Sequence, residues 1–384
     1  MVSRVWLLTK KVQSRIFQDL SVPDILKQVF TGYDVTFDLS ATYYQRPCCV
    51  QYRESDFDFA GRLMEEEGIY YFFVHSEGHH QLVVSDAEST HPKVSGQSQV
   101  LYEDVRGGVR EGVRVRTWEK TQELRAGKYT VWDYCFEQPG SHLEESEPTI
   151  GKAKVGTVTH ELHPVNDQLE IYDYPGGFAK RFDGVDRKGN ARGVEMAHMY
   201  DDGGRTVRVR MQEEECRGLE IAGTGDCGQF SAGHTFALEG HFNGDGEYLL
   251  TCVDHDAHQA GFRSGEKDDF GYDNRFRCMP VDLTYRPRRA TPRPVIAGVQ
   301  TATVTGPAGE NTSGQEIFCD QYGRVKVQFH WDRQGKRDGD TSCWLRVAQI
   351  WAGHPTSARH ATSPIIDLCS IGSPAPIRRS WARR

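Results

Sequence analysis

The apolar positions in the first 40 residues predict a strand, a short helix and a second strand. Residues 5–8 form a continuous apolar run (VWLL), which is typical of a strand interior. Ser21 and Asp24 make a capping box ahead of apolar positions that recur with helical spacing through residue 30. Apolar and polar residues then alternate over 33–39, the period of a strand with one buried face. With a strand pattern so close to Met1, we expect the chain to begin inside a domain.

The stretch ESDFDFAGRLMEEEGIYYFF predicts a second helix followed by a β-hairpin. Ser55 is expected to cap this helix, with Asp58 at its third position. Gly68 suits the left-handed position that ends a helix. An apolar strand over 69–74 follows, and the chain returns as a strand over 81–85 after a short turn.

Three consecutive carboxylates, Glu65, Glu66 and Glu67, occupy the last turn of this second helix. A catalytic or metal-binding role would require their oxygens to converge, but consecutive helical residues project about 100° apart. They also lie at the negative end of the helix dipole. We therefore expect a solvated helix end without catalytic function. The alternative is a carboxylate-dependent hydrolase, in which alanine substitutions would abolish activity.

The rest of the first 290 residues reads mainly as short strands between turns rich in glycine and proline. The expected strands lie within residues 113–136, 169–174, 219–221, 235–238 and 248–253. Residues 207–219 have a helical pattern with an acidic face, and residues 263–275 are polar and rich in glycine, as in a loop. The predicted fold class is therefore mainly β with some short helices (α+β).

Residues 286–294 mark a domain boundary, because they hold three prolines and four arginines. Strands are expected after it at 295–304, 324–329 and 344–350. Short strands between Gly- and Asp-rich turns over about 60 residues suit a small barrel, and an OB-fold is the natural candidate. The last 32 residues, 353–384, hold five arginines, four prolines and one acid, and we expect a disordered basic tail there.

Composition narrows the possible functions. A net charge of −8 disfavours broad binding to nucleic acids or anionic membranes. We find no signal-peptide pattern and no apolar run long enough to span a membrane. The ten cysteines show no C-x-x-C spacing, so we expect free thiols in a reducing cytoplasm. No cofactor-binding fingerprint occurs.

Apart from the three glutamates, histidines offer the other metal-like patterns. His255 and His258, with His241 before them, could suggest zinc, but residues three apart on a strand face opposite ways. We expect turn histidines in a strand connection, and we expect the same for His79 and His80. No metal site is therefore predicted.

The OB-like region has features that could suggest binding of single-stranded nucleic acid, which needs a basic groove with exposed aromatic rings. Phe329, however, shares a strand face with Val325 and Val327, so we expect its ring to be core and predict no nucleic-acid partner. The basic and aromatic candidates are Arg324, Lys326, Arg333, Lys336, Arg337, Phe329 and Trp331.

Three stretches carry distinctive motifs. The first is VQYRESDFDFAGRLMEEEGIYYFF at 50–73, and the second is YDYPG at 172–176. The third is DQYGRVKVQFHWD at 320–332, followed by SCWLRV at 342–347 and WAG at 351–353. Together they resemble the VgrG family, the spike proteins of bacterial type VI secretion systems, over residues 1 to about 353.

This resemblance implies a fold and a function. Residues 1–290 would be most of a phage baseplate hub-like domain with β-barrels, and 291–352 an OB-fold like that of the gp5 spike base. The chain would be a structural homotrimer that caps the Hcp tube, contacts baseplate components and carries a PAAR tip protein and effectors. It would be cytoplasmic before firing, then driven through a target membrane and translocated. Candidate trimer contacts are Ile69–Val74 and Val325–Phe329. A prophage tail baseplate hub is the alternative.

Two departures from the family pattern concern the ends. The first hub barrel is expected to be incomplete at its N-terminal side. After residue 353 the family continues into a β-helix needle, whereas this chain has the basic tail. We interpret the tail as out-of-frame, and downstream DNA without a β-helix repeat in another frame would contradict this.

Overall fold

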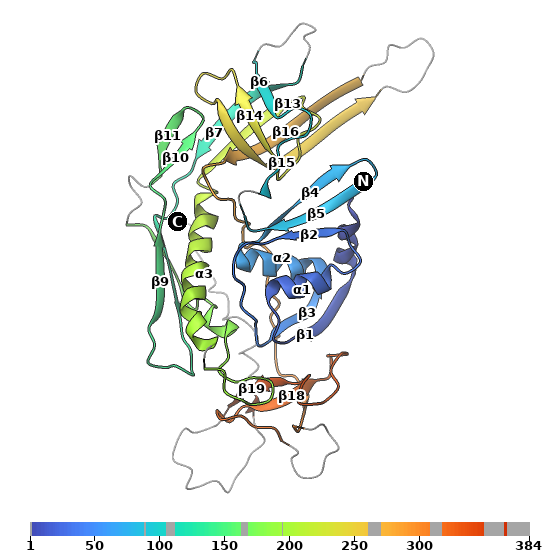
Figure 1. The fold of residues 1–384 in the computed structure, drawn as a ribbon, viewed down its shortest axis with the longest axis vertical. Helices are drawn as coiled ribbons and strands as arrows, with labels where there is room; N and C mark the ends of the chain where they lie inside the picture. The colour runs from blue at the N-terminus through green and yellow to red at the C-terminus, as the bar shows by residue number, and fades with distance from the viewer. Residues whose placement is uncertain are drawn as a thin grey trace, which may run out of the picture.

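The computed structural model describes residues 2–87, 90–104, 112–162, 168–193, 195–259, 270–307, 317–348 and 365–366. Strands dominate these ranges and the helices are mostly short, which confirms the predicted mainly-β class (Figure 1). The helices are η1 (Arg4–Lys10), α1 (Val22–Val29), α2 (Asp56–Glu67), η3 (Ala179–Arg181), η4 (Glu195–Ala197) and α3 (His198–Glu215). None of the helices in these ranges has the length and apolar content that crossing a bilayer would need.

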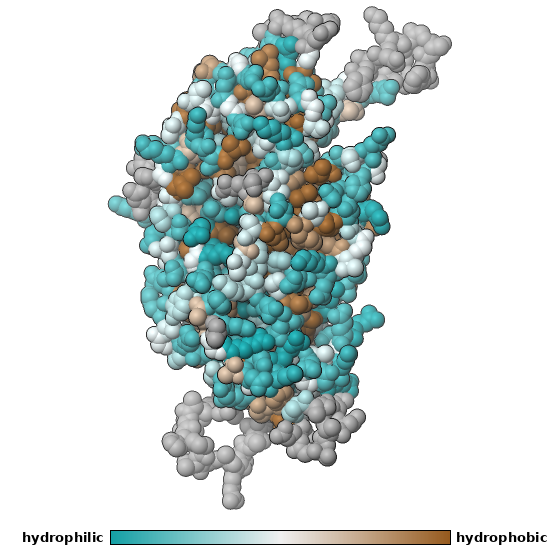
Figure 2. Space-filling view, viewed as in Figure 1, coloured by the Kyte–Doolittle hydropathy of each residue, from teal (hydrophilic) through white to brown (hydrophobic). Residues whose placement is uncertain are grey.

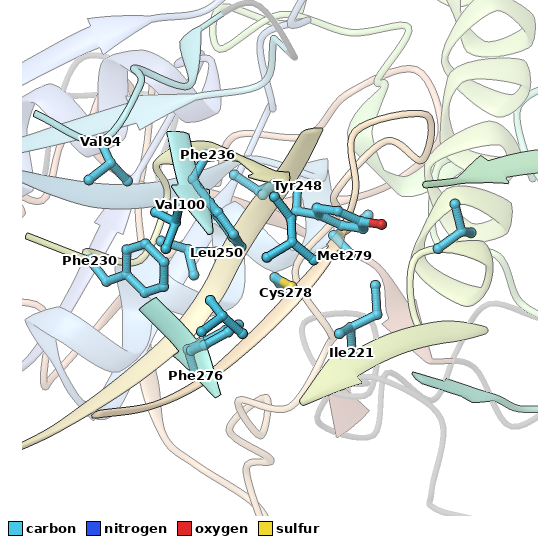
Figure 3. Packing of buried hydrophobic residues seen from close by; sticks show 14 of the residues in the cluster. Val94, Val100, Ile221, Phe230, Phe236, Tyr248, Leu250, Phe276, Cys278 and Met279 are labelled. Atoms are coloured by element: carbon cyan, nitrogen blue, oxygen red, sulfur yellow. The ribbon is translucent and has the colours of Figure 1, made fainter. Parts of the chain in front are cut away.

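A closed six-stranded barrel lies at one end of the molecule, at the top of Figure 1. Its strands, in order around the barrel, are β13 (Leu219–Gly225), β16 (Phe270–Pro280), β15 (Gly246–Gln259), β14 (Thr235–Glu239), β6 (Gln99–Tyr102) and β7 (Arg114–Gln122). Aromatic rings fill its interior, and Phe236, Tyr248 and Phe276 are each at most 2% exposed (Figure 3). Residues 270–275, predicted as loop, belong to β16, because they continue the pairing with β15. The remainder of that prediction, 263–269, lies outside the described residues.

The N-terminal part packs α1 and α2 between a three-stranded sheet and a two-stranded one (Figure 1). The larger sheet has the order β2 (Val35–Asp38), β5 (His79–Ser85), β4 (Tyr70–Ser76). The smaller one pairs β1 (Val12–Phe17) with β3 (Cys49–Ser55). Phe59 and Leu63 on α2 are fully buried, and the Phe59 ring stacks on Phe17 with centroids 5.4 Å apart.

Helix α3 runs through the middle of the molecule between α2 and a sheet that contains β9 (Figure 1). That sheet has the order β12 (Glu170–Asp173), β8 (Lys128–Asp133), β9 (Leu143–Pro148), and the hairpin β10 (Lys152–Val155) and β11 (Val158–Glu161) lies beside it. The helix predicted over 207–219 thus begins earlier and ends earlier. Met199, Val207 and Met211 bury its apolar side.

The C-terminal sheet has the order β17 (Ala302–Val304), β18 (Val325–Phe329), β19 (Cys343–Leu345), and β20 (Val347–Ala348) pairs with β21 (Ile365–Ile366). Val327 and Phe329 are almost completely buried in its core. The strand predicted over 295–304 is reduced to β17. The OB-fold assignment stays a prediction, and the predicted tail lies outside the described residues apart from β21.

The helix caps predicted from the sequence are present in α1 and α2. The hydroxyls of Ser21 and Ser55 accept the main-chain N–H of Asp24 and Asp58, and Gly68 is left-handed with φ 73°. Residues 5–8, predicted as a strand, instead belong to η1. A 3-10 turn brings residues three apart to one side, so Val5 and Leu8 are buried while the two side chains between them are exposed.

Candidate functional site

The C-terminal end of α2, which carries the three glutamates, is enclosed by arginines from distant segments. Helix termini leave carbonyls without helical partners, and cations are favoured there. Arg210 on α3 donates to the carbonyl oxygens of Glu65 and Glu66 at 3.2 and 2.7 Å. Arg286 donates to the carbonyl oxygen of Gly68 at 2.9 Å. The helix end is therefore neutralised by protein groups, and the prediction that it is solvated is wrong.

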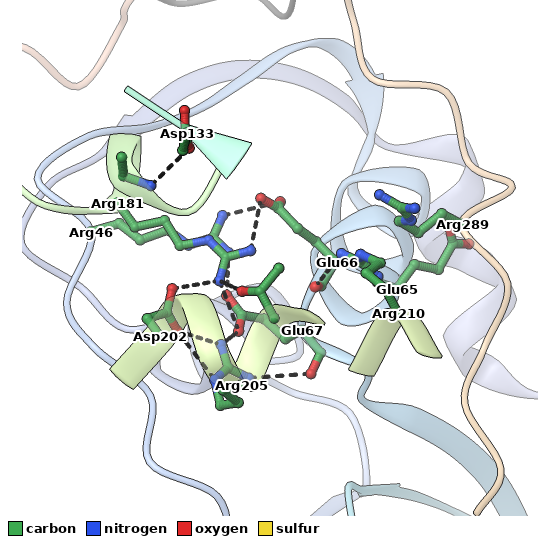
Figure 4. A network of polar contacts seen from close by, with 12 residues as sticks. Arg46, Glu65, Glu66, Glu67, Asp133, Arg181, Asp202, Arg205, Arg210 and Arg289 are labelled. Atoms are coloured by element: carbon green, nitrogen blue, oxygen red, sulfur yellow. Dashed lines mark hydrogen bonds and ion pairs between the residues drawn. The ribbon is translucent and has the colours of Figure 1, made fainter. Parts of the chain in front are cut away.

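The side chains of Glu66 and Glu67 belong to a buried ion network, shown in Figure 4. Arg46 donates to Glu66 at 3.2 Å and also to Glu67. Arg181 lies 3.5 Å from Glu66. The network consists of Glu66, Glu67, Asp202, Arg46, Arg181 and Arg205. Three carboxylates thus face three guanidinium groups, so the charges balance.

Asp202 and Arg205 bring α3 into the ion network. Asp202 is 1% exposed and accepts from Arg181 at 2.7 Å and from Arg205 at 2.9 Å. Arg205 also donates to Glu67, which is itself 4% exposed. The network therefore joins α2, α3, η3 and the segment before β3. A buried pair of this kind is strongly destabilised when one partner is lost.

The arginines of the ion network keep the carboxyl groups of Glu66 and Glu67 ionised. Burial alone would raise the pKa of Glu66, but Arg46 and Arg181 outweigh it and keep that pKa well below its usual range. The same balance, dominated by Arg181 and Arg205, lowers the pKa of Glu67. Neither carboxyl carries a proton near neutral pH, so neither can serve as a general acid.

The side chain of Glu65 points away from Glu66 and Glu67, as the helical spacing predicts, and contacts residues 290–291. Its carboxylate accepts the N–H groups of Ala290 and Thr291, both at 2.9 Å, and the Thr291 hydroxyl at 2.7 Å. It therefore fastens the extended segment after Arg286 to α2. The three glutamates do not converge on one point, but Glu66 and Glu67 share Arg46 and Arg181, which the sequence did not indicate.

The expectation that His255, His258, His79 and His80 lie in turns is wrong, because all four lie in strands. His255 and His258 lie within β15 rather than in a turn, because the pairing with β16 extends past them. His79 and His80 lie in β5, and the turn is formed by the two residues before them. In the described ranges, no group of three or more His, Cys, Asp or Glu side chains is placed to hold a metal ion.

Two of the basic residues considered for nucleic-acid binding are buried. Arg324 is 7% exposed and pairs with Asp183 through two contacts of 2.8 Å. Lys326 is fully buried and donates to the carbonyl oxygen of Gly339. Phe329 is 1% exposed, as predicted from its strand face. These side chains do not line an exposed basic groove.

Comparison with known proteins shows similarity to phage tail hub and type VI spike proteins. The family model for the phage tail baseplate hub (GPD) matches residues 1–261. The type VI secretion system spike proteins VgrG1c and VgrG1a of Pseudomonas aeruginosa are 36% and 38% identical to this chain over 355 residues, which is 91% of it. These alignments cover 44% and 50% of the two relatives, so the chain spans about half the length of the relatives it matches.

A solved structure supports the fold. The E. coli c3393 protein, described as a type VI secretion component with structural similarity to the T4 bacteriophage tail proteins gp27 and gp5, matches with a TM-score of 0.52. The match has 18% identity and covers 90% of this chain and 72% of that chain. The resemblance to VgrG spike proteins predicted from the sequence is confirmed. Since the family model covers more than half of the residues, the chain belongs to the phage tail baseplate hub family.

Proposed function

We propose that this chain is a structural part of a type VI secretion spike. It assembles as a homotrimer, caps the Hcp tube, and aids membrane puncture and effector delivery. It is cytoplasmic before firing and is translocated afterwards. The observation that carries this proposal is the 36–38% identity to type VI spike proteins over 91% of the chain.

The geometry of the glutamates supports a structural role rather than an enzymatic one. Glu66 and Glu67 are ionised and paired, and Glu65 is occupied by three donors from the segment at 290–291. These contacts tie α2, α3 and the extended segment together. A protein that transmits force during injection requires such firmly joined elements, whereas the hydrolase alternative requires a free, protonated acid.

We also propose the division into a hub-like domain, 1–290, and an OB-fold, 291–352. The segment that joins them is irregular from Thr284 to residue 301. Arg286 and Arg289 nevertheless fasten its first part, since Arg286 donates to Gln212 at 2.8 Å and Arg289 to Tyr129 at 2.9 Å. These contacts tie the segment through Arg289 to the hub-like part and support a boundary near residue 290.

The hairpin strand β4 is the better of the two candidate trimer contacts. Strand β18 is core within one chain, because Val327 and Phe329 are buried there. By contrast, Tyr71 on β4 is 41% exposed and lines a cavity of about 700 Å³ shared with β15. Figure 2 shows apolar residues gathered on this part of the surface, beside the barrel.

The mass in solution tests the proposed assembly. Size-exclusion chromatography with light scattering should give a mass three times the 43.5 kDa of one chain. Tyr71→Asp should reduce that mass if β4 forms the contact, while Tyr322→Asp, at an exposed tyrosine in the C-terminal part, should not. Purified Hcp rings should co-elute with the trimer. A monomer at every concentration, with no binding to Hcp, would contradict the proposal.

A prophage tail baseplate hub is the second candidate, and the family model over residues 1–261 favours it. The two functions differ in the tube protein that the hub binds, which is Hcp in a secretion system and a tail-tube protein in a phage. Binding to a phage tail-tube protein encoded beside this gene, without binding to Hcp, would favour the phage hub.

A further inference from the structure

Two cysteines far apart in the sequence meet where the hub-like part contacts the C-terminal sheet. The sulfur atoms of Cys48 and Cys343 lie 3.9 Å apart, although 295 positions separate the two residues. Cys48 directly precedes β3 and is exposed, whereas Cys343 begins β19 and is 3% exposed. The cysteines in the described residues form no disulfide, and the separation of these two sulfurs is a non-bonded contact.

Non-covalent contacts hold the two parts in register around the pair. Gln18 on the hub side donates to the carbonyl oxygen of Ser342 at 2.9 Å and to the Cys343 sulfur at 3.5 Å. The indole of Trp344 donates to the carbonyl oxygen of Asp186 at 3.1 Å. Both residues that flank Cys343 are thus fixed to the hub-like part, which keeps its sulfur close to Cys48.

The pair also faces a positively charged cavity of about 200 Å³, which both cysteines line. Its basic lining residues are Lys180, Arg293 and Arg346, together with Arg46, Arg62 and Arg324, which are paired with acids. Glu137 and Asp183 are its acidic lining residues, so cationic side chains outnumber acidic ones. A cavity with an excess of positive charge concentrates small anions. The cavity therefore favours an anionic reagent beside the thiols.

We propose that Cys48 and Cys343 form a redox-sensitive pair, which closes to an interdomain disulfide when the chain meets an anionic low-molecular-weight disulfide in an oxidising compartment. A disulfide needs the sulfurs at about 2.0 Å. At 3.9 Å the two sulfurs are in non-bonded contact, and they must approach each other by about 2 Å to form the bond.

The chemistry is thiol–disulfide exchange. One protein thiol loses its proton and attacks a sulfur of the reagent, whose S–S bond breaks and releases one reagent thiolate. The second protein thiol then loses its proton and attacks the protein sulfur of the mixed disulfide, which expels the second reagent thiolate. Two electrons pass to the reagent, and two protons leave the protein for the reagent thiolates. The contact with Cys48 lowers the pKa of Cys343, whereas the same contact raises the pKa of Cys48 well above its usual range. Cys343 is therefore the thiol that ionises first and attacks the reagent.

Peptide mapping of the wild-type protein tests the proposal directly. The folded chain is incubated with oxidised glutathione, alkylated with iodoacetamide, digested and analysed by mass spectrometry. We expect a peptide that links Cys48 to Cys343, lost on treatment with dithiothreitol, and a higher Tm for the oxidised form. Finding both cysteines alkylated or carrying glutathione, or finding Cys49 linked to Cys343 instead, would overturn the proposal.

Variants sharpen the test. Cys48→Ser and Cys343→Ser should each abolish the linked peptide and the oxidant-dependent rise in Tm. Cys319→Ser removes another exposed cysteine of the C-terminal part and should retain both. Because the peptide map uses the unaltered chain, a variant that fails to fold leaves the proposal falsifiable. The result does not depend on the proposed spike function, which the mass and the Hcp binding test separately.

Discussion

Arg205 on α3 donates both to the carboxylate of Glu67 and to its main-chain carbonyl oxygen, the latter at 3.4 Å. One guanidinium thus neutralises an acid and caps the helix that carries it. Because cations are favoured at a helix C-terminus, this double contact offsets the unfavourable position of Glu67 at the end of α2. It also explains how a carboxylate can be buried in the last turn of a helix.

Removal of the Glu67 charge should strongly destabilise the protein. In Glu67→Gln, the buried Arg46 and the partly buried Arg205 lose a charged partner, and breaking a buried ion pair costs about 3–5 kcal/mol. Urea unfolding followed by circular dichroism measures the free energy of unfolding. Glu77→Gln, at an exposed hairpin turn, should change it by less than about 0.5 kcal/mol. A similar small loss in both variants would contradict the burial of the ion network.

The stability should fall on acidification. The folded-state pKa values of Glu66 and Glu67 lie below their ordinary value of 4.5. Such groups contribute stability that is fully present above the ordinary value and is lost as pH falls through the folded values. Urea midpoints measured between about pH 6 and about pH 3 should therefore decrease, and the decrease should be shallower in Glu67→Gln. Parallel curves for the two proteins would be evidence against this explanation.

Glu137 should have the opposite effect. Burial, together with the neighbouring Asp183, raises the pKa of Glu137 to about 7. A carboxyl with a raised folded-state pKa costs stability once pH rises above its ordinary value of 4.5, and the full cost is reached above about 7. Glu137→Gln keeps an oxygen for the Gly184 N–H and should stabilise the protein on the order of 1 kcal/mol at alkaline pH. The gain should vanish near pH 5, and thermal melts at both pH values would show whether it does.

Gly68 and Gly78 offer a matched pair of substitutions. Both have positive φ, +73° and +70°, so alanine is strained by about 1 kcal/mol or more at either position. A Cβ at Gly68 would also lie 2.5 Å from a methyl group of Val209 on α3, whereas at Gly78 nothing lies within 4 Å. Gly68→Ala should therefore cost about 1–3 kcal/mol more than Gly78→Ala in urea unfolding. Equal losses would indicate that α3 can move aside.

Features that depend on neighbouring residues could be predicted from the sequence. The caps at Ser21 and Ser55, the left-handed Gly68 and the buried face of β18 all follow from residues within a few positions of one another. Each is specified by local backbone chemistry or by side-chain period. The mainly-β class follows from the same kind of pattern.

The ion network could not be predicted in this way. Arg46 lies 20 positions from Glu66, and Arg205 lies 138 positions from Glu67, so no local spacing marks either partner. Glutamates at a helix end are expected to be exposed to solvent unless the tertiary arrangement is known. The strand predicted for residues 5–8 is wrong for a different reason. A short apolar run has no period that distinguishes a strand from a helical turn.

The shared arginines of the ion network have a consequence for how the protein opens. Arg46 and Arg181 each contact both Glu66 and Glu67, and Arg205 on α3 contacts Glu67. The end of α2 therefore cannot fray without exposing charges on η3 and α3 at the same time. Amide protons in the last turn of α2 and in the middle of α3 should therefore exchange with solvent deuterium at one common rate, as a single cooperative unit.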